Sequence, residues 1–168
     1  MTFSETLNQY LRELNDDLTQ VDTAVKTGRV MVDAILNGKL NVAAQNRIPV
    51  NVKARIPDGT PCTDVDLCVI LGNLLDNAVE ENAKLPEDDR FLRVYLGQKN
   101  TQLYLAVTNA AGKKREKRAG LFASGKGTEH GFGLARVRST VQKYGGLFSA
   151  DSEDGGFTAE ILIPLGAS

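Results

Sequence analysis

The chain has 168 residues, of which 42% are hydrophobic and 24% charged, as in ordinary globular proteins. This length favours one domain, alone or with a small appendage, and the composition excludes a chain that is disordered along most of its length. The net charge of -1 at pH 7 provides no general attraction to nucleic acid or to anionic membranes, so we expect no nucleic-acid partner.

The first predicted element is a helix over residues 3–25. Its apolar side chains recur every three or four residues, which is typical of an amphipathic helix with a coiled-coil-like seam. We expect a homodimer through this seam, although a helix packed on its own domain would show the same pattern. The segment lacks the basic start and apolar run of a signal peptide, and nothing in the chain approaches the roughly 20 apolar residues of a membrane span. The seam consists of Phe3, Leu7, Tyr10, Leu14, Leu18, Val21 and Val25.

The later chain alternates helical and extended patterns. Helices are expected at about 30–44, 64–83 and 133–144, and strands at about 49–56, 91–96, 103–108, 147–150 and 157–163. The glycine-rich, basic residues 110–130 are expected to form a loop, whose charges are those of a solvated segment rather than a nucleic-acid patch. Three helices and about five strands predict a two-layer α+β sandwich over residues 46–168, with residues 1–45 standing beside it.

The helix expected at 64–83 has a broad apolar face and a narrow polar stripe opposite. Asn73 and Asn77 stack at a spacing of four residues, although asparagine costs roughly 0.5 kcal/mol relative to alanine inside a helix. Amide oxygens suit Mg²⁺, which typically takes few protein ligands together with phosphates and water. A ligand or metal site and a solvated face therefore both remain open. The stripe consists of Asp66, Asn73, Asp76, Asn77 and Glu80.

Cysteine and histidine are too few for a zinc site, and the single histidine weakens the case for nucleophilic catalysis. Cys62, Cys68 and the single histidine, His130, cannot supply four zinc ligands. No serine or cysteine lies near His130 in the sequence, which weakens any catalytic dyad. We expect Cys68 to be a small buried apolar residue.

A second candidate site lies where glycines precede the helix expected at 133–144. Gly131 and Gly133 would let a phosphate approach the backbone, and a helix N-terminus offers free N–H groups. A flexible loop with a glycine start would look the same. Two known phosphate loops are excluded, because Gly127 replaces the hydroxyl residue of a P-loop and Arg136 replaces the third glycine of a dinucleotide-binding loop.

Five segments in a fixed order resemble the GHKL ATPases, which include gyrase, heat-shock chaperones, histidine kinases and MutL. The resemblance covers about residues 48–165 and implies a Bergerat-type fold, a mixed and mostly antiparallel sheet with about three helices on one face. It also implies ATP and Mg²⁺ as ligands. The segments are NLLDNAVEE from Asn73, LYLAVTNAAG, Leu121-Phe122, HGFGLARVRSTVQKYGG and GGFTAEILIP.

The resemblance assigns roles to particular residues. It implies that Asn77 binds Mg²⁺, that Asn109 contacts adenine, and that Asn73 is catalytic and orients water or the acceptor. The same family pattern makes residues 111–130 a lid that closes over the nucleotide. Asn109 could otherwise be a turn former at the end of a strand. The nucleotide-binding positions implied are Asn73, Asn77, Asn109, Lys126, Thr128, His130, Gly131, Phe132, Gly133 and Leu134.

Residues 10–48 are similar to the second dimerisation helix and connector of peptide-pheromone (quorum-sensing) sensor kinases. This implies that residues 1–45 end a dimerisation hairpin and that the phosphoacceptor histidine lies on an earlier helix, absent here. The implied function is a protein histidine kinase in two-component signalling, which transfers the γ-phosphate of ATP to that histidine and acts upstream of a response regulator. The implied location is a cytoplasmic domain of a membrane-anchored parent.

Three departures from the family pattern suggest weak nucleotide binding. Asn109 and Ala111 stand where most members have aspartate and glycine, and Glu80 replaces a basic residue. An uncharged amide still accepts a hydrogen bond from adenine, but without a charge to strengthen it. The alternative is a nucleotide-free scaffold or phosphotransfer module with a degenerate ATP site. A serine kinase of the anti-sigma type is a third possibility, which the hairpin-like N-terminus disfavours.

Overall fold

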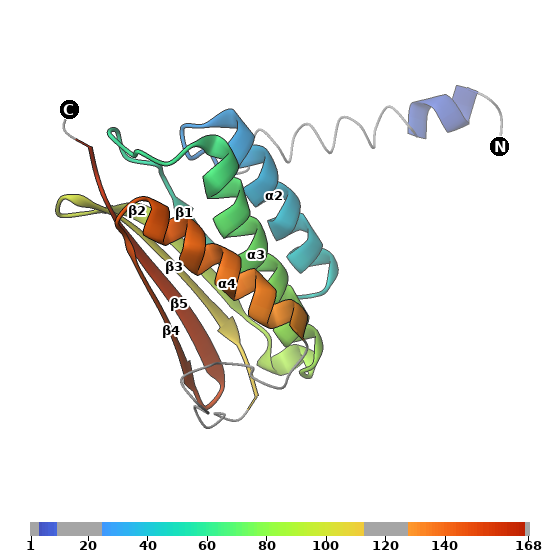
Figure 1. The fold of residues 1–168 in the computed structure, drawn as a ribbon. Coiled ribbons are helices and arrows are strands. Elements are labelled where there is room, and N and C mark those ends of the chain that lie inside the picture. The colour runs from blue at the N-terminus through green and yellow to red at the C-terminus, as the bar shows by residue number, and fades with distance from the viewer. Residues whose placement is uncertain (1–3, 10–24, 113–127, 167–168) are drawn as a thin grey trace.

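A computed structural model describes residues 4–9, 25–112 and 128–166 (Figure 1). Of the helix expected over residues 3–25, residues 4–9 are helical, whereas Val25 is not helical and packs against the core. Residue 3 and residues 10–24 lie outside the described residues. Most of the expected lid, residues 113–127, lies outside them as well. Among the described helices, none combines the length and the apolar character that crossing a membrane requires.

The molecule has two layers, with helices on one face of a single sheet (Figure 1). The long helices are α2 (Val30–Gln45), α3 (Asp64–Ala83) and α4 (Thr128–Lys143), and a short 3₁₀ helix, η1, spans Glu87–Asp89. The strands are β1 (Val50–Ala54), β2 (Leu92–Lys99), β3 (Gln102–Ala110), β4 (Leu147–Glu153) and β5 (Gly156–Pro164). The predicted two-layer α+β sandwich is confirmed.

The sheet has the strand order β1-β2-β3-β5-β4. β1 and β2 are parallel and the other three pairs are antiparallel, so the predicted mixed, mostly antiparallel sheet is confirmed. β2 and β3 extend further than predicted, because their pairing continues to Lys99 and Gln102 around a tight turn. Asn100 adopts a φ of 56° in this turn, a left-handed conformation that asparagine tolerates.

The core lies between the sheet and the apolar face of α3. Leu67, Leu71 and Leu75 recur every four residues along α3 and are fully buried, as the sequence predicts. Burying each such side chain stabilises the fold by roughly 1.5–3 kcal/mol. Thr63 begins the helix, since its hydroxyl accepts a hydrogen bond of 3.1 Å from the Asp66 amide.

α2 is part of this core, which corrects the expectation that residues 1–45 stand beside the domain. Val32, Leu36 and Ala43 of α2 are fully buried in the same cluster as the apolar residues of α3. The boundary expected between residues 45 and 46 therefore falls inside one core. An apolar periodicity shows that a helix has a face to bury, but it does not identify the partner. The assignment of residues 1–45 to a dimerisation hairpin remains a prediction.

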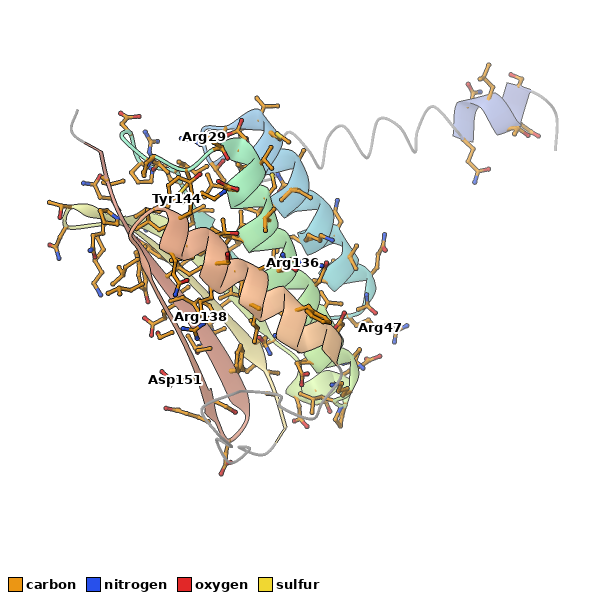
Figure 2. The ribbon with its side chains drawn as sticks, viewed as in Figure 1. Arg29, Arg47, Arg136, Arg138, Tyr144 and Asp151 are labelled. Carbon is orange, nitrogen blue, oxygen red and sulfur yellow. The ribbon has the colours of Figure 1, made fainter. Side chains whose placement is uncertain are left out.

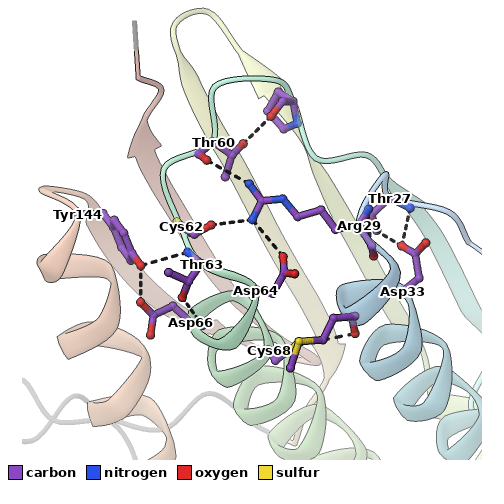
Figure 3. Close-up of polar contacts among 12 residues, drawn as sticks. Thr27, Arg29, Asp33, Thr60, Cys62, Thr63, Asp64, Asp66, Cys68 and Tyr144 are labelled. Carbon is purple, nitrogen blue, oxygen red and sulfur yellow. Dashed lines mark hydrogen bonds and ion pairs between the residues drawn. The ribbon is translucent and has the colours of Figure 1, made fainter. Parts of the chain in front are cut away.

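A polar network joins the chain before α2 to the start of α3 (Figure 3). Arg29 donates from Nη1 to the Cys62 carbonyl over 2.6 Å and from Nη2 to the Thr60 carbonyl over 3.1 Å. The Arg29 guanidinium also pairs with Asp64 at 3.2 Å. Arg29 thus holds the start of α2 against the N-terminal end of α3 and the residues just before it.

The same end of α3 is fixed to the C-terminal end of α4 (Figure 3). The Tyr144 hydroxyl accepts a hydrogen bond of 3.2 Å from the Thr63 amide and donates one to Asp66. Lys143 pairs with Asp66 at 3.0 Å. These contacts require α3 and α4 to run antiparallel, with the two fixed ends adjacent.

Acid should weaken this junction through Asp66. The hydrogen bond from Tyr144, and then that from Lys143, lower the pKa of Asp66 below its ordinary value. A lowered carboxyl pKa stabilises the fold fully above the unfolded-state pKa, and the stabilisation is lost as the pH falls below the ordinary carboxyl pKa of 3.8 and through the lower folded-state pKa. We expect Asp66→Asn to flatten the fall of Tm with acidification over this range in thermal denaturation.

Tyr144→Phe is the matched variant for this experiment. It removes the largest cause of the lowered pKa while keeping the carboxyl group, so its Tm profile should lie between those of the wild type and Asp66→Asn. Identical profiles for all three proteins would contradict a role of Asp66 in acid stability.

Candidate functional site

The centre of the candidate site is the contact between Asn73 of α3 and Gly133 of α4. A Cβ atom at Gly133 would lie 3.3 Å from Asn73 Oδ1, tighter than an ordinary van der Waals contact. Asn73 Nδ2 donates to the Val69 carbonyl over 2.7 Å, which turns Oδ1 away from that carbonyl. The absence of a side chain at Gly133 therefore leaves α4 backbone beside an oriented amide oxygen.

The prediction that Gly131 and Gly133 lie in a loop before the helix is wrong. α4 begins at Thr128, so Gly131 and Gly133 lie within its first two turns instead of preceding the helix. Glycine usually indicates a loop, but at position 133 it permits the close approach to Asn73.

The neighbouring predicted residues divide between exposed and packed positions. Phe132 is 61% exposed, whereas Leu134 is half-buried and packs against the core. Thr128 and His130 lie in the first turn of α4, but their side chains are outside the described part of the chain, and Lys126 is outside it entirely. The nucleotide contacts of these residues remain predictions.

Asn109 lies at the end of β3, on the face of the sheet that the helices cover. Leu103, Leu105 and Val107 alternate along that face, and Asn109 continues the alternation with only 1% of its surface exposed. Its Nδ2 atom donates to the Ala110 carbonyl over 2.9 Å. Because that bond uses the Nδ2 donor of the Asn109 amide, its acceptor Oδ1 points away from the Ala110 carbonyl.

The polar stripe of α3 divides among different neighbours. Asp76 pairs with Lys39 of α2 at 2.7 Å, and Asp66 bonds to the end of α4. Asn77 is half-buried and lies one turn after Asn73 on the same side of the helix. Of the five stripe residues, Asn73 and Asn77 therefore remain the candidates for ligand or metal binding. The two aspartates form ion pairs that join α3 to α2 and α4.

Sequence reasoning missed a third asparagine of this helix, Asn82. This side chain is fully buried, and its Oδ1 accepts from the Phe91 amide over 3.0 Å. Its Nδ2 donates to the Ala78 carbonyl over 2.9 Å and to the Phe91 carbonyl over 3.1 Å. A signal was present, because Asn82 follows Ala78 by four residues and so falls on the apolar face, where an amide requires buried partners.

The arginines of α4 point to different neighbours. Figure 2 shows Arg136 on the side of α4 toward α3 and Arg138 on the side toward the sheet, where its guanidinium lies 5.1 Å from the centre of the Phe148 ring. Arg136 is thus directed toward α3, which carries Asn73, whereas Arg138 packs on β4. Two surface hollows lie away from this region, one at the turn between β4 and β5 and one between residues 27–29 and 55–59.

The two cysteines are free thiols and play no part in the site. Cys62 is buried, and this burial raises its thiol pKa to about 11, which leaves it protonated and unreactive at neutral pH. Cys68, expected to be buried, is half-buried instead. Among the described residues no group of three or more His, Cys, Asp or Glu side chains could hold a metal.

Comparisons with solved structures establish the fold. The chain matches the catalytic domain of histidine kinase ThkA with a TM-score of 0.65 at 17% identity, over 82% of this chain and 93% of that one. It matches the mycobacterial sensor histidine kinase MprB with a TM-score of 0.58 at 20% identity, over 80% of this chain and 96% of that one. The fold is that of a histidine kinase catalytic domain.

Sequence comparisons establish the family. The model of the GHKL domain matches residues 63–164, the stretch that contains the asparagines of α3, Asn109 and the glycines of α4. The chain belongs to the GHKL domain family. This confirms the resemblance on which the expected site was based.

Among curated relatives, the chain is similar to sensor histidine kinase DcuS of Escherichia coli (strain K12), with 31% identity over 92% of this chain and 28% of that protein. It is also similar to a probable C4-dicarboxylate sensor kinase of Halalkalibacterium halodurans, with 31% identity over 64% of this chain and 21% of that protein. The chain thus spans less than a third of the length of these relatives. The expected kinship with peptide-pheromone sensor kinases stays a prediction.

Proposed function

We propose that this chain binds ATP with Mg²⁺ as the catalytic domain of a sensor histidine kinase. It would transfer the γ-phosphate to a histidine on another helix, since His130 is the only histidine in the chain and lies at the start of α4. The observation that carries the proposal is the contact of Gly133 with Asn73 inside the stretch that matches the GHKL domain. An amide oxygen lies there beside a part of α4 that carries no side chain, and this oxygen can serve a phosphate–metal group.

The proposed roles follow the chemistry of each group. Asn77 holds Mg²⁺, whose charge when bound neutralises that of the phosphates. Asn109 accepts a hydrogen bond from the adenine amino group, and the α4 backbone at Gly131 and Gly133 lies against the phosphates. Asn73 orients water or the acceptor. These residues bind and align the reactants, which is the main protein contribution to phosphoryl transfer.

The partners proposed for the parent protein follow from the same function. They are a phosphoacceptor histidine helix, a downstream response regulator and a second copy held through residues 3–25. The parent would be anchored in a membrane, with this domain in the cytoplasm.

Calorimetric titration with a non-hydrolysable ATP analogue tests the proposal. Saturable binding at one site per chain, lost when EDTA removes Mg²⁺, is the expected result. A polypeptide carrying a phosphoacceptor histidine should then be labelled in trans from γ-labelled ATP. Absence of binding up to millimolar nucleotide would instead favour the nucleotide-free scaffold, with Asn109 and Ala111 as the departures responsible.

Gly133→Ala should weaken ATP binding without destabilising the fold. The added Cβ would press on Asn73 Oδ1 at 3.3 Å and cover the backbone that faces the phosphates. We expect the Kd to rise about tenfold, which is equivalent to about 1.4 kcal/mol. Stability should rise slightly, because alanine is favoured over glycine by about 1 kcal/mol inside a helix.

The matched control is Gly38→Ala on α2, where an added Cβ meets no atom within 4 Å. It should stabilise its helix in the same way and leave the Kd unchanged. Equal nucleotide affinity for both variants in calorimetry would contradict a role of the Gly133 backbone in binding.

A further inference from the structure

Asn82 begins a chain of hydrogen bonds that runs from α3 to the end of β3. Its Nδ2 donates to the Phe91 carbonyl over 3.1 Å, and the same carbonyl accepts from the Ala110 amide over 3.1 Å. The Ala110 carbonyl in turn accepts from Asn109 Nδ2 over 2.9 Å. Three hydrogen bonds therefore connect the side-chain amide of Asn82 on α3 to that of Asn109 at the end of β3.

Asn82 satisfies both backbone groups of Phe91, the residue that precedes β2. Its Oδ1 accepts from the Phe91 amide, so the side chain binds Phe91 much as a neighbouring strand would. Asn82 is fully buried, and buried polar groups require partners. A side chain that cannot both donate and accept would remove at least one of the two hydrogen bonds between Asn82 and Phe91.

Asn82 and Asn77 use different sides of α3. Five residues at 100° each place their side chains about 140° apart around the helix. Asn82 faces the sheet, where its partner Phe91 lies, while Asn77 shares the side of Asn73 that meets α4. The helix therefore carries one asparagine toward the expected metal and another toward the strand that holds Asn109.

We propose that Asn82 is a positioning residue for nucleotide binding: it fixes the spacing between Asn77 on α3 and Asn109 at the end of β3. The inference rests on the proposed function, because both residues are its expected ligand contacts. Asn82 itself does not touch the nucleotide. Its hydrogen bonds hold Phe91 against α3, and Phe91 in turn holds the end of β3. In this way Asn82 keeps Asn109, the expected adenine contact, at a fixed distance from Asn77, the expected metal contact.

The test compares Asn82→Ala with Leu103→Ala in calorimetric titration with Mg²⁺ and a non-hydrolysable ATP analogue. Leu103 is a buried residue at the opposite end of β3, so its truncation destabilises the same strand far from Asn109. Both variants should lower Tm, and titrations are made where circular dichroism shows each protein folded. We expect the Kd to rise at least tenfold for Asn82→Ala and to stay at the wild-type value for Leu103→Ala.

Amide hydrogen exchange supplies a readout independent of ligand. The Ala110 amide should exchange faster in Asn82→Ala than in Leu103→Ala, because its acceptor, the Phe91 carbonyl, is no longer fixed. If Asn82→Ala does not fold, Asn82→Asp serves instead, since it keeps the acceptor for the Phe91 amide and loses the amide donor to the Phe91 carbonyl.

Wild-type affinity in a folded Asn82 variant would overturn the inference while leaving the proposed function intact. A wild-type protein that binds no nucleotide would overturn both. An equal loss of affinity in Leu103→Ala would also overturn the inference, because it would show that general destabilisation of β3 is sufficient.

Discussion

Asn77→Ala should abolish Mg²⁺-dependent ATP binding, with a rise in Kd of at least about a hundredfold, equivalent to about 2.7 kcal/mol. Mg²⁺ takes few protein ligands, so the loss of one amide oxygen removes a large share of what the protein supplies. The fold should not suffer from the change in helix propensity, because alanine is a better helix former than asparagine by roughly 0.5 kcal/mol. Calorimetry gives the Kd and thermal denaturation the stability.

The control for Asn77→Ala is its neighbour, Asp76→Ala. Asp76 pairs with Lys39 of α2 at 2.7 Å and points away from α4, so its removal breaks a partly exposed ion pair and little else. Its Kd should equal that of the wild type. If Asn77→Ala binds the nucleotide as tightly as Asp76→Ala does, the metal ligand is not Asn77.

Gly146→Ala should destabilise the fold by about 3 kcal/mol or more, which is the upper end of the cost of overpacking a core. A Cβ at this position would lie 2.6 Å from the Leu162 carbonyl oxygen, 2.8 Å from Val141 Cγ1 and 2.9 Å from Ile163 Cγ1. The first of these atoms belongs to the backbone of β5, so relief requires a shift of strand or helix. The midpoint of urea denaturation should fall accordingly.

The adjacent glycine gives a matched control for this experiment. Gly145 has a φ of +69° but open space around its missing Cβ. Gly145→Ala should therefore cost only the strain of a left-handed alanine, about 1–2 kcal/mol. A larger loss for Gly145→Ala than for Gly146→Ala would show that backbone strain, and not the contact with β5, governs this turn.

Elements with local signals are predictable from sequence alone. α3 begins and ends where predicted, because Thr63 caps its start and Pro86 follows its end. The partners of an element are not predictable in this way. The pattern of α2 indicates a buried face but does not show that Leu36 shares the core with Leu71 of α3.

The candidate site shows the same limit. The spacing of Asn73 and Asn77 is sufficient to place both on one side of α3, since helical geometry is local. The separation of Asp66 and Asp76 from them depends on Lys143 and Lys39, which lie far away in the sequence. From the sequence alone, the glycines of α4 indicate a loop. The reason for a glycine at position 133 inside the helix is its tertiary contact with Asn73, which the sequence does not show.

The hydrogen bonds of Tyr144 with Thr63 and Asp66 fix the C-terminal end of α4 to the start of α3. Gly133 lies ten residues before Lys143, so it stands about 15 Å along the helix from the fixed end at a rise of 1.5 Å per residue. A tilt of only about 4° about that end would displace the first turns by about 1 Å. A small rotation of α4 is therefore sufficient to change the space beside Asn73, and the Tyr144 junction together with the core packing of Leu134 and Val137 resists that rotation.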